Sequence, residues 1–139
     1  MSEQQNTTLI QSLYDAFGRG DVQTILNSLT DDVQWALEGP VIIPFAGQRR
    51  GISQVRSFFE ALATTQTGRK LNMEPFIAQG DQVAAYGRYS CTVTATGKKL
   101  DCPIAHFFTI RNGKVSRFVD LTDTAAVADA YQSASAAAR

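Results

Sequence analysis

Three turn signals divide the second half of the chain into strand-length runs, and this pattern restricts the possible folds more than any other feature. The turns lie at Gln79-Gly80-Asp81, Thr96-Gly97-Lys98 and Asn112-Gly113. The Asn-Gly pair is a strong signal for a two-residue hairpin, because both of its positions tolerate a positive φ angle. The runs between the turns predict consecutive antiparallel strands near residues 70–78, 83–95, 99–110 and 114–121.

The first half of the chain has the periodicity of helices instead. Apolar side chains recur at helical spacing in residues 9–17, 22–29 and 52–62. A short strand is expected at 33–37, and Thr122-Asp123 caps a last, alanine-rich helix. Helices followed by a strand meander indicate the α+β class.

The segment from Gly39 to Arg50 carries two prolines and two glycines and predicts a loop. It is unusually apolar for a loop, since Val41, Ile42, Ile43 and Phe45 all lie within it. Such side chains are poor choices for solvent exposure unless they cover something. We therefore expect this loop to form the roof of a pocket, together with the helix that follows it.

Composition excludes several classes of function. The 139 residues suit one domain, which we place at 1–139 with an ordered core at about 5–132. The formal net charge is zero, with 13 basic and 13 acidic residues, so we expect no nucleic-acid partner and no binding to anionic membranes. The polar start of the chain and the absence of a long apolar stretch favour a cytoplasmic protein.

The chain has few residues that could bind a metal. Cys91 and Cys102 have no metal-binding spacing, and His106 is the single histidine, so we expect no metal and no cofactor. In a cytoplasmic protein the two cysteines are expected to be buried, reduced thiols.

Hairpin parity predicts which side chains share a face of the sheet. If Asn112-Gly113 is a two-residue turn, Ala105 lies opposite Asp120 and His106 lies opposite Val119. A two-residue turn at Thr96-Gly97 would place Arg88 beside Ala105. A one-residue bulge at either turn would change this parity.

Two predicted faces follow from this register. The face suited to a ligand cavity mixes aromatic and polar groups, namely Tyr86, Arg88, Ser90, Ala105, Phe107, Phe118 and Asp120. The other face is mostly apolar and contains Tyr89, Cys91, Cys102, Ile104, His106, Phe108 and Val119. We expect Ile104, Phe108 and Val119 to form a homodimer interface, and His106 to be packed or interfacial.

Several segments resemble the nuclear transport factor 2-like superfamily, which includes ketosteroid isomerases, SnoaL-like polyketide cyclases and limonene epoxide hydrolases. The resemblance at the start of the chain lies in Leu13–Phe17, Gly20-Asp21 and Leu29–Trp35. Later, Pro103–Phe107 and Gly113–Val115 are similar to the late strands of the ketosteroid isomerases. The resemblance covers nearly the whole chain and implies a cone-shaped, curved antiparallel sheet with about four helices around an apolar cavity, a cystatin-like roll.

The resemblance also bears on catalytic residues. The isomerase constellation is not matched, because Ala105, Leu37 and Leu13 stand at its acid, base and tyrosine positions. Arg88 and Asp120 resemble part of the epoxide hydrolase set, but Ser90 replaces its second aspartate. In SnoaL-like cyclases one aspartate on the last strand acts as acid and base, and Asp120 is similar in position.

We therefore predict Asp120 as the general acid/base residue and Arg88 as the group that orients it or stabilises negative charge. Alternatively, Asp120 pairs with an arginine or caps the last helix, and Arg88 holds an anionic ligand group or lies at the surface. The predicted substrate-binding residues are Tyr14, Trp35, Phe45, Phe58, Phe59, Tyr86, Ser90, Phe107 and Phe118.

The predicted function is that of a cofactor-independent isomerase, cyclase or dehydratase acting on a small hydrophobic carbonyl compound. The alternative is a module of the same fold that binds a small molecule or a protein without chemistry. The fold hosts both classes, so the fold alone does not decide between them.

Overall fold

The computed structural model describes residues 2–133 of the chain. Within these residues four helices and six strands follow one another. In chain order they are α1 (Glu3–Gly18), α2 (Val22–Asn27), β1 (Leu29–Leu37), β2 (Gly47–Arg50), α3 (Ile52–Thr65), β3 (Gln66–Gln79), β4 (Gln82–Val93), β5 (Lys99–Arg111), β6 (Lys114–Thr122) and α4 (Thr124–Tyr131).

Polar side chains set the beginnings of three helices. Ser2 forms a capping box with Gln5 at the start of α1, which satisfies two backbone N–H groups that the helix leaves free. Asp21 caps α2 and Asp123 caps α4 in the same way, each accepting a backbone N–H three residues later. The cap at Asp123 places the last helix directly after β6.

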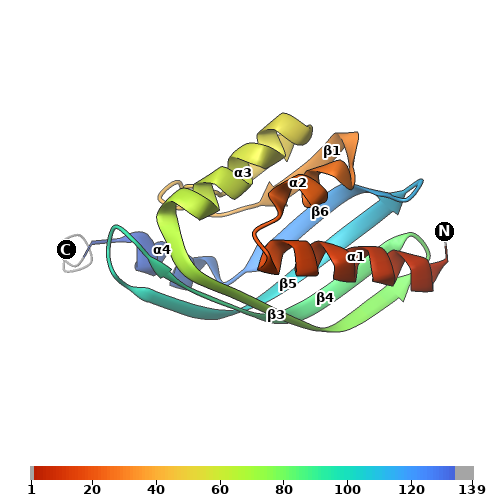
Figure 1. Cartoon of the computed structure of the whole chain (residues 1–139). Helices are drawn as coiled ribbons and strands as arrows, with labels where there is room; N and C mark the ends of the chain where they lie inside the picture. The colour runs from red at the N-terminus through yellow and green to blue at the C-terminus, as the bar shows by residue number, and fades with distance from the viewer. Residues whose placement is uncertain (1, 134–139) are drawn as a thin grey trace.

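The six strands form one curved sheet in the order β2-β1-β6-β5-β4-β3. Helices α1, α2 and α3 cover one side of it, and α4 lies at the end where the described chain stops (Figure 1). The predicted α+β class with about four helices is therefore confirmed. In one detail the sheet differs from the prediction, because β1 and β6 pair in parallel while the other four neighbouring pairs are antiparallel.

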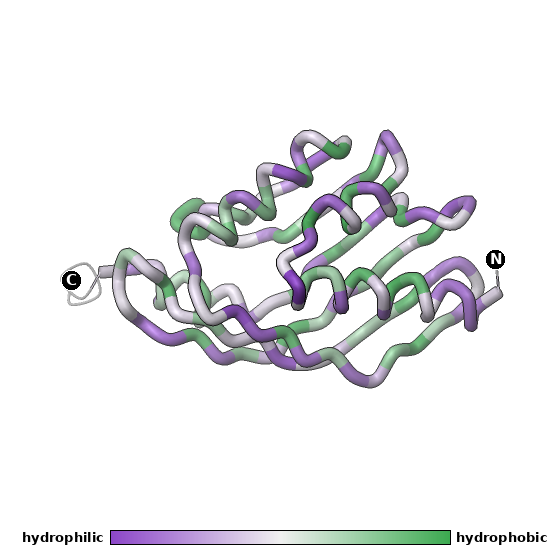
Figure 2. Tube along the Cα trace, in the orientation of Figure 1, coloured by the Kyte–Doolittle hydropathy of each residue, from purple (hydrophilic) through white to green (hydrophobic). Residues whose placement is uncertain are grey.

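The core lies between the curved sheet and the helices. Hydrophobic and hydrophilic residues alternate along the strands, as the hydropathy colours show (Figure 2). The inward residues pack against apolar helix faces, with Ile10, Leu26 and Val55 each almost fully buried. Cys91 and Cys102 belong to the same core and are free thiols. Because three helices cover one face of the sheet, the opposite face is the outer surface.

A bulge in β6 overturns the predicted β5–β6 register. The two-residue turn is present, with Asn112 at φ 53° and Gly113 at φ 79°, and Ile110 pairs with Val115. The next pair, however, joins Thr109 to Arg117, so Ser116 has no partner and its hydroxyl donates to the Thr109 carbonyl. The extra residue reverses the parity beyond it. His106 consequently lies opposite Asp120, and the predicted pairing of His106 with Val119 is wrong.

The β4–β5 hairpin also differs from the prediction, by two residues. Its loop covers residues 94–98, longer than the two-residue turn expected, and Thr92 pairs with Lys99. Arg88 therefore lies opposite Pro103 and Tyr86 opposite Ala105. A shift of two residues leaves the side chains of β4 and β5 on the faces predicted relative to each other. The residues predicted to share the cavity face are therefore separated only by the bulge in β6, which turns Phe118 and Asp120 to the opposite face.

Candidate active site

A cavity of about 80 Å³ opens between the concave face of the sheet and the helices. Most of its wall is apolar, formed by residues of α1, α3, the strands and Val127 of α4. Seven of the predicted site residues lie in this wall: Tyr14, Trp35, Phe45, Phe58, Phe59, Phe118 and Asp120. Phe45 comes from the apolar loop before β2, where Ile43 is also buried while Val41 is fully exposed.

The other four predicted site residues lie on the outer face of the sheet. Tyr86 is 55% exposed and Phe107 is 47% exposed. Arg88 is exposed and donates from Nε to Oδ1 of Asp101 over 3.0 Å. Ser90 pairs with Asp101 on the neighbouring strand. The predicted pairing of Arg88 with Asp120 is therefore wrong, because the bulge turns Asp120 to the opposite face.

Asp120 instead belongs to a chain of four polar side chains at the cavity wall. Its side chain is 7% exposed, and its Oδ1 atom accepts a short hydrogen bond from the Thr122 hydroxyl. Its Oδ2 atom lies 3.4 Å from Nε2 of His106. On the other side of the imidazole, Nδ1 lies 2.7 Å from the Tyr14 hydroxyl. A phenol, an imidazole, a carboxyl group and an alcohol thus meet in largely apolar surroundings.

The environment keeps Tyr14 in its phenol form. Burial raises the pKa of Tyr14 far above its ordinary value, and the nearby Asp120 raises it further. The phenol can therefore donate its proton to Nδ1 of His106. In that arrangement Nδ1 accepts the hydrogen bond, and the N–H group of the imidazole is at Nε2, which faces Asp120.

Two nitrogen atoms at the wall have no hydrogen-bond acceptor. Nε2 of His106 lies near Asp120, but the alignment is not that of a hydrogen bond. Nε1 of Trp35 is buried and has no hydrogen-bond partner among the described residues. Both rings pack on Phe118, with ring centroids 4.8 Å from His106 and 4.0 Å from Trp35. Buried N–H groups without an acceptor are uncommon, and a ligand that brings an oxygen atom would satisfy them.

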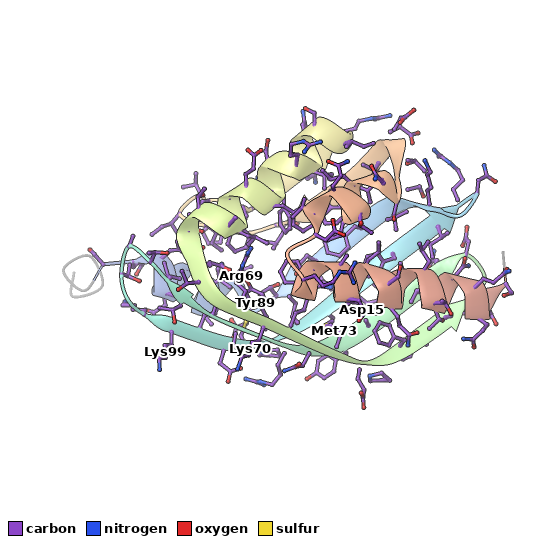
Figure 3. All side chains as sticks on the ribbon, in the orientation of Figure 1. Asp15, Arg69, Lys70, Met73, Tyr89 and Lys99 are labelled. Atoms are coloured by element: carbon purple, nitrogen blue, oxygen red, sulfur yellow. The ribbon has the colours of Figure 1, made fainter. Side chains whose placement is uncertain are left out.

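A second polar cluster lies at the other side of the cavity. Tyr89 lines the wall and donates a short hydrogen bond to Gln66, whose amide nitrogen donates to the Tyr131 hydroxyl over 2.9 Å. Arg69 lies with Tyr89 on the helix side of the sheet, while Lys70 points the other way (Figure 3). Arg69 stacks over the Phe17 ring at 5.6 Å. This cluster joins α4 to β3 and β4, and so holds one end of the cavity together.

The sequence prediction missed three polar wall residues: His106, Tyr89 and Thr122. One available signal was the spacing of Val115 and Phe118. Both side chains are buried, yet an uninterrupted strand points residues three apart to opposite faces. A one-residue bulge between Val115 and Phe118 places both side chains on the buried face. The same bulge places Asp120 opposite His106.

Residues 2–133 contain neither a metal-binding cluster nor a membrane-spanning helix. No group of three or more His, Cys, Asp or Glu side chains in this range is placed to hold a metal ion. No helix in the same range is long and apolar enough to cross a membrane.

The chemistry available at the wall is proton transfer. A carboxyl group beside an imidazole can take a proton from a ligand and return it at another atom. The apolar wall around it would exclude water from a bound molecule and strengthen the electrostatic effect of each polar group.

Comparisons with known proteins agree with this architecture. An NTF2-like protein of unknown function from Burkholderia pseudomallei is 25% identical, with a TM-score of 0.87 over 96% of this chain and 100% of that one. An NTF2-like protein from Burkholderia thailandensis is 29% identical, with a TM-score of 0.83 over 95% of this chain and 99% of that one. TerC, crystallised with polyporic acid, is 29% identical, with a TM-score of 0.83 over 93% of this chain and 99% of that one.

No curated protein matches the chain. The model of the SnoaL-like domain family, in contrast, matches residues 10–118, a range that runs from within α1 to Phe118 in β6. The resemblance to the nuclear transport factor 2-like superfamily is thus confirmed, and the chain belongs to the SnoaL-like domain family.

Proposed function

We propose that the protein is a cofactor-independent acid/base enzyme, of the isomerase, cyclase or dehydratase type, acting on a small hydrophobic carbonyl compound. Membership of the SnoaL-like family supports this class of reaction. The crystallisation of the relative TerC with polyporic acid supports an organic molecule as the ligand. The cavity of about 80 Å³ is below the roughly 300–1,000 Å³ of pockets for drug-sized ligands, which favours a small substrate.

One observation carries the proposal: Asp120 is buried in an apolar cavity, with the imidazole of His106 beside it and no lysine or arginine among the described wall residues. A buried carboxyl group costs free energy unless it is paired, and such groups concentrate at functional sites. Asp120 has an alcohol and an imidazole as neighbours, and in the described chain the basic Arg88 pairs elsewhere.

In the proposed reaction Asp120 removes a proton from the carbon next to the substrate carbonyl. The electron pair of the broken C–H bond moves toward the carbonyl oxygen and forms an enolate. His106 positions the carboxyl group through Nε2, while Tyr14 holds the imidazole through Nδ1. Asp120 then returns the proton at a different carbon, which completes an isomerisation. In a cyclisation the enolate carbon instead bonds to a second carbonyl carbon of the same molecule, the π bond of that carbonyl breaks, and its oxygen takes the proton from Asp120.

The test measures exchange of the α-protons of 2-indanone in deuterium oxide by ¹H NMR. We expect the wild-type protein to accelerate exchange, and Asp120→Asn to lower the protein-dependent rate by at least about 100-fold, since acid/base groups contribute this much. Asp101→Asn is the matched control, because this aspartate lies exposed on the outer face, and its rate should stay within about twofold of wild type.

The result that would overturn the proposal is a wild-type protein that binds 2-indanone without accelerating its exchange. The cavity would then serve binding alone, as in the alternative function. Retention of the full rate by Asp120→Asn would overturn the assignment of Asp120 as the base.

A further inference from the structure

The polar groups at the cavity wall are almost all engaged with one another. The hydroxyl of Tyr14 contacts His106, that of Tyr89 donates to Gln66, and that of Thr122 donates to Asp120. Nε2 of His106 faces Asp120. Among the wall residues that the structure describes, Trp35 is the one whose donor has neither an acceptor nor an acid beside it.

The surroundings of Trp35 explain why its N–H has no acceptor. The side chain is 4% exposed, so water does not reach the indole nitrogen. Its nearest rings are those of Phe58, Phe59 and Phe118, with centroids at 5.6, 5.6 and 4.0 Å. An indole nitrogen can only donate, and burying it unpaired costs about 1–3 kcal/mol.

The strands place this donor near the proposed base. Trp35 pairs with Phe118 across the parallel β1–β6 contact, and Asp120 follows two residues later on the same face of β6. Trp35 and Asp120 therefore stand on neighbouring strands, about two residues apart along the sheet, and both line the same cavity. A carbonyl oxygen bound at the indole would direct its neighbouring carbon toward Asp120.

We propose that the N–H group of Trp35 binds the carbonyl oxygen of the ligand and selects oxygenated ligands over hydrocarbons of the same shape. This inference rests on the proposed function, because it supplies the group that holds the oxygen of the enolate. A donor at that oxygen stabilises the negative charge that develops as the proton leaves. Trp35 is therefore a substrate-binding residue with a defined polar role.

The test uses the fact that Trp35 is the only tryptophan of the chain, so the ¹⁵N-labelled protein has one indole resonance. The probes are 2-indanone and indane, which share a bicyclic shape and differ in the carbonyl oxygen. We expect 2-indanone to move the indole proton downfield, as a new hydrogen bond does, and indane to leave it near its free position. Equal movement with both probes would overturn the inference.

Calorimetric titration of variants provides a second measurement. Trp35→Phe keeps an aromatic ring, removes the donor and loses part of the indole surface, which affects both probes. The Kd for 2-indanone should therefore rise about tenfold more than the Kd for indane, equivalent to about 1.4 kcal/mol. Phe58→Leu is the control, because it alters packing at the same wall and should weaken both probes by the same factor. If Trp35→Phe weakens both probes equally, Trp35 acts by packing alone.

The two proposals fail separately. A downfield indole shift without proton exchange would retain Trp35 as the oxygen-binding group and remove the acid/base function. Proton exchange without discrimination by the indole would retain Asp120 as the base and remove the role of Trp35. Should Trp35→Phe not fold, the wild-type indole resonance still decides the inference.

Discussion

At the scale of residues, His106 connects the two polar ends of the cavity wall. Its imidazole lies nearly parallel to the Tyr14 ring, with 5° between the planes, and its two nitrogens face the phenol and the Asp120 carboxyl group. Removing the imidazole would leave the Tyr14 hydroxyl without its partner and Asp120 with Thr122 alone. The contributions of Tyr14 and His106 to the free energy of unfolding are therefore coupled, and a double-variant comparison measures the coupling.

We expect His106→Leu to lower the free energy of unfolding by about 2–4 kcal/mol, because it leaves buried polar groups unpaired. Tyr14→Phe should cost less, about 1–2 kcal/mol. The double variant should cost about 1 kcal/mol less than the sum of the single variants, since both break the same hydrogen bond. Urea unfolding at pH 7 provides the three values, and strict additivity would contradict the link between the two residues.

Tyr14 also predicts how stability depends on alkaline pH. Its pKa is raised from 10.0 by burial and by Asp120, so the folded state keeps the phenol proton at a pH where the unfolded chain loses it. Below about pH 10 this residue adds no pH dependence. Above that value the unfolded state is favoured by up to about 1.4 kcal/mol per pH unit.

The measurement compares urea unfolding at pH 8 and pH 11 for wild type and Tyr14→Phe. Wild type should lose about 1.4 kcal/mol more than the variant over this interval, because only wild type has this phenol to ionise. Tyr89 and Cys91, whose pKa values are also raised by burial, remain in both proteins and cancel in the comparison. Equal losses in the two proteins would contradict a buried, neutral Tyr14.

At the scale of elements, the β3–β4 pair depends on a close approach at Gly87. A Cβ atom there would lie 1.9 Å from the Asn72 carbonyl oxygen and 2.8 Å from the Met73 Cα atom. These are backbone atoms of β3, beside an irregularity in the pairing of the two strands between Met73 and Phe76. They cannot move without disturbing the strand.

We expect Gly87→Ala to lower the free energy of unfolding by about 3 kcal/mol or more, the upper end of the range for overpacking. Gly18→Ala is the matched control, because nothing lies within 4 Å of a Cβ atom at this helical position. That variant should be neutral or stabilising by up to about 1 kcal/mol. Thermal and urea unfolding of both variants test the contrast, which a fully stable Gly87→Ala protein would refute.

The sequence was sufficient to predict most helices and strands, but not which side chains share a face of the sheet. Turn residues and helical periodicity are local signals, so the helices and most strands lie close to where they were expected. The exception is β2, which lies within the segment that was predicted as a loop. Asp120 lines the cavity, but it does not pair with Arg88, which the predicted register placed on the same face. Parity is a property of two strands together, and one unpaired residue at Ser116 reversed it. The bulge has a weak signal in the sequence, because neither glycine nor proline stands at or beside Ser116 to mark it.

At the scale of the whole molecule, the outer face of the sheet is unusually apolar. Ile77, Tyr86, Phe107 and Leu121 point away from the helices and are between 47% and 63% exposed. Their strands are neighbours, and Ala84 and Ala105 fill the positions between them. Two of the residues expected at a dimer interface, Ile104 and Phe108, are buried at the cavity instead. The exposed apolar residues of the outer face are therefore the candidates for a dimer interface.

We predict that the protein forms a homodimer through this outer face, because contiguous exposed apolar residues usually mark an interface. Leu121→Lys should shift the protein toward the monomer in sedimentation equilibrium at tens of micromolar. Val41→Lys is the control, since Val41 is fully exposed but lies on the loop before β2 and not on the sheet. A wild-type monomer at these concentrations would refute the prediction.

The unpaired Ser116 has a consequence for comparing relatives of this protein. Insertion or deletion of one residue near the Asn112-Gly113 hairpin exchanges the side chains that look into the cavity for those that look away from it. In one register the final strand directs Phe118 and Asp120 inward, and in the other it directs Val119 and Leu121 inward. Two relatives can thus have nearly the same residues in this strand and still present different side chains to their ligands. A one-residue gap at this place in an alignment therefore marks a candidate change of function.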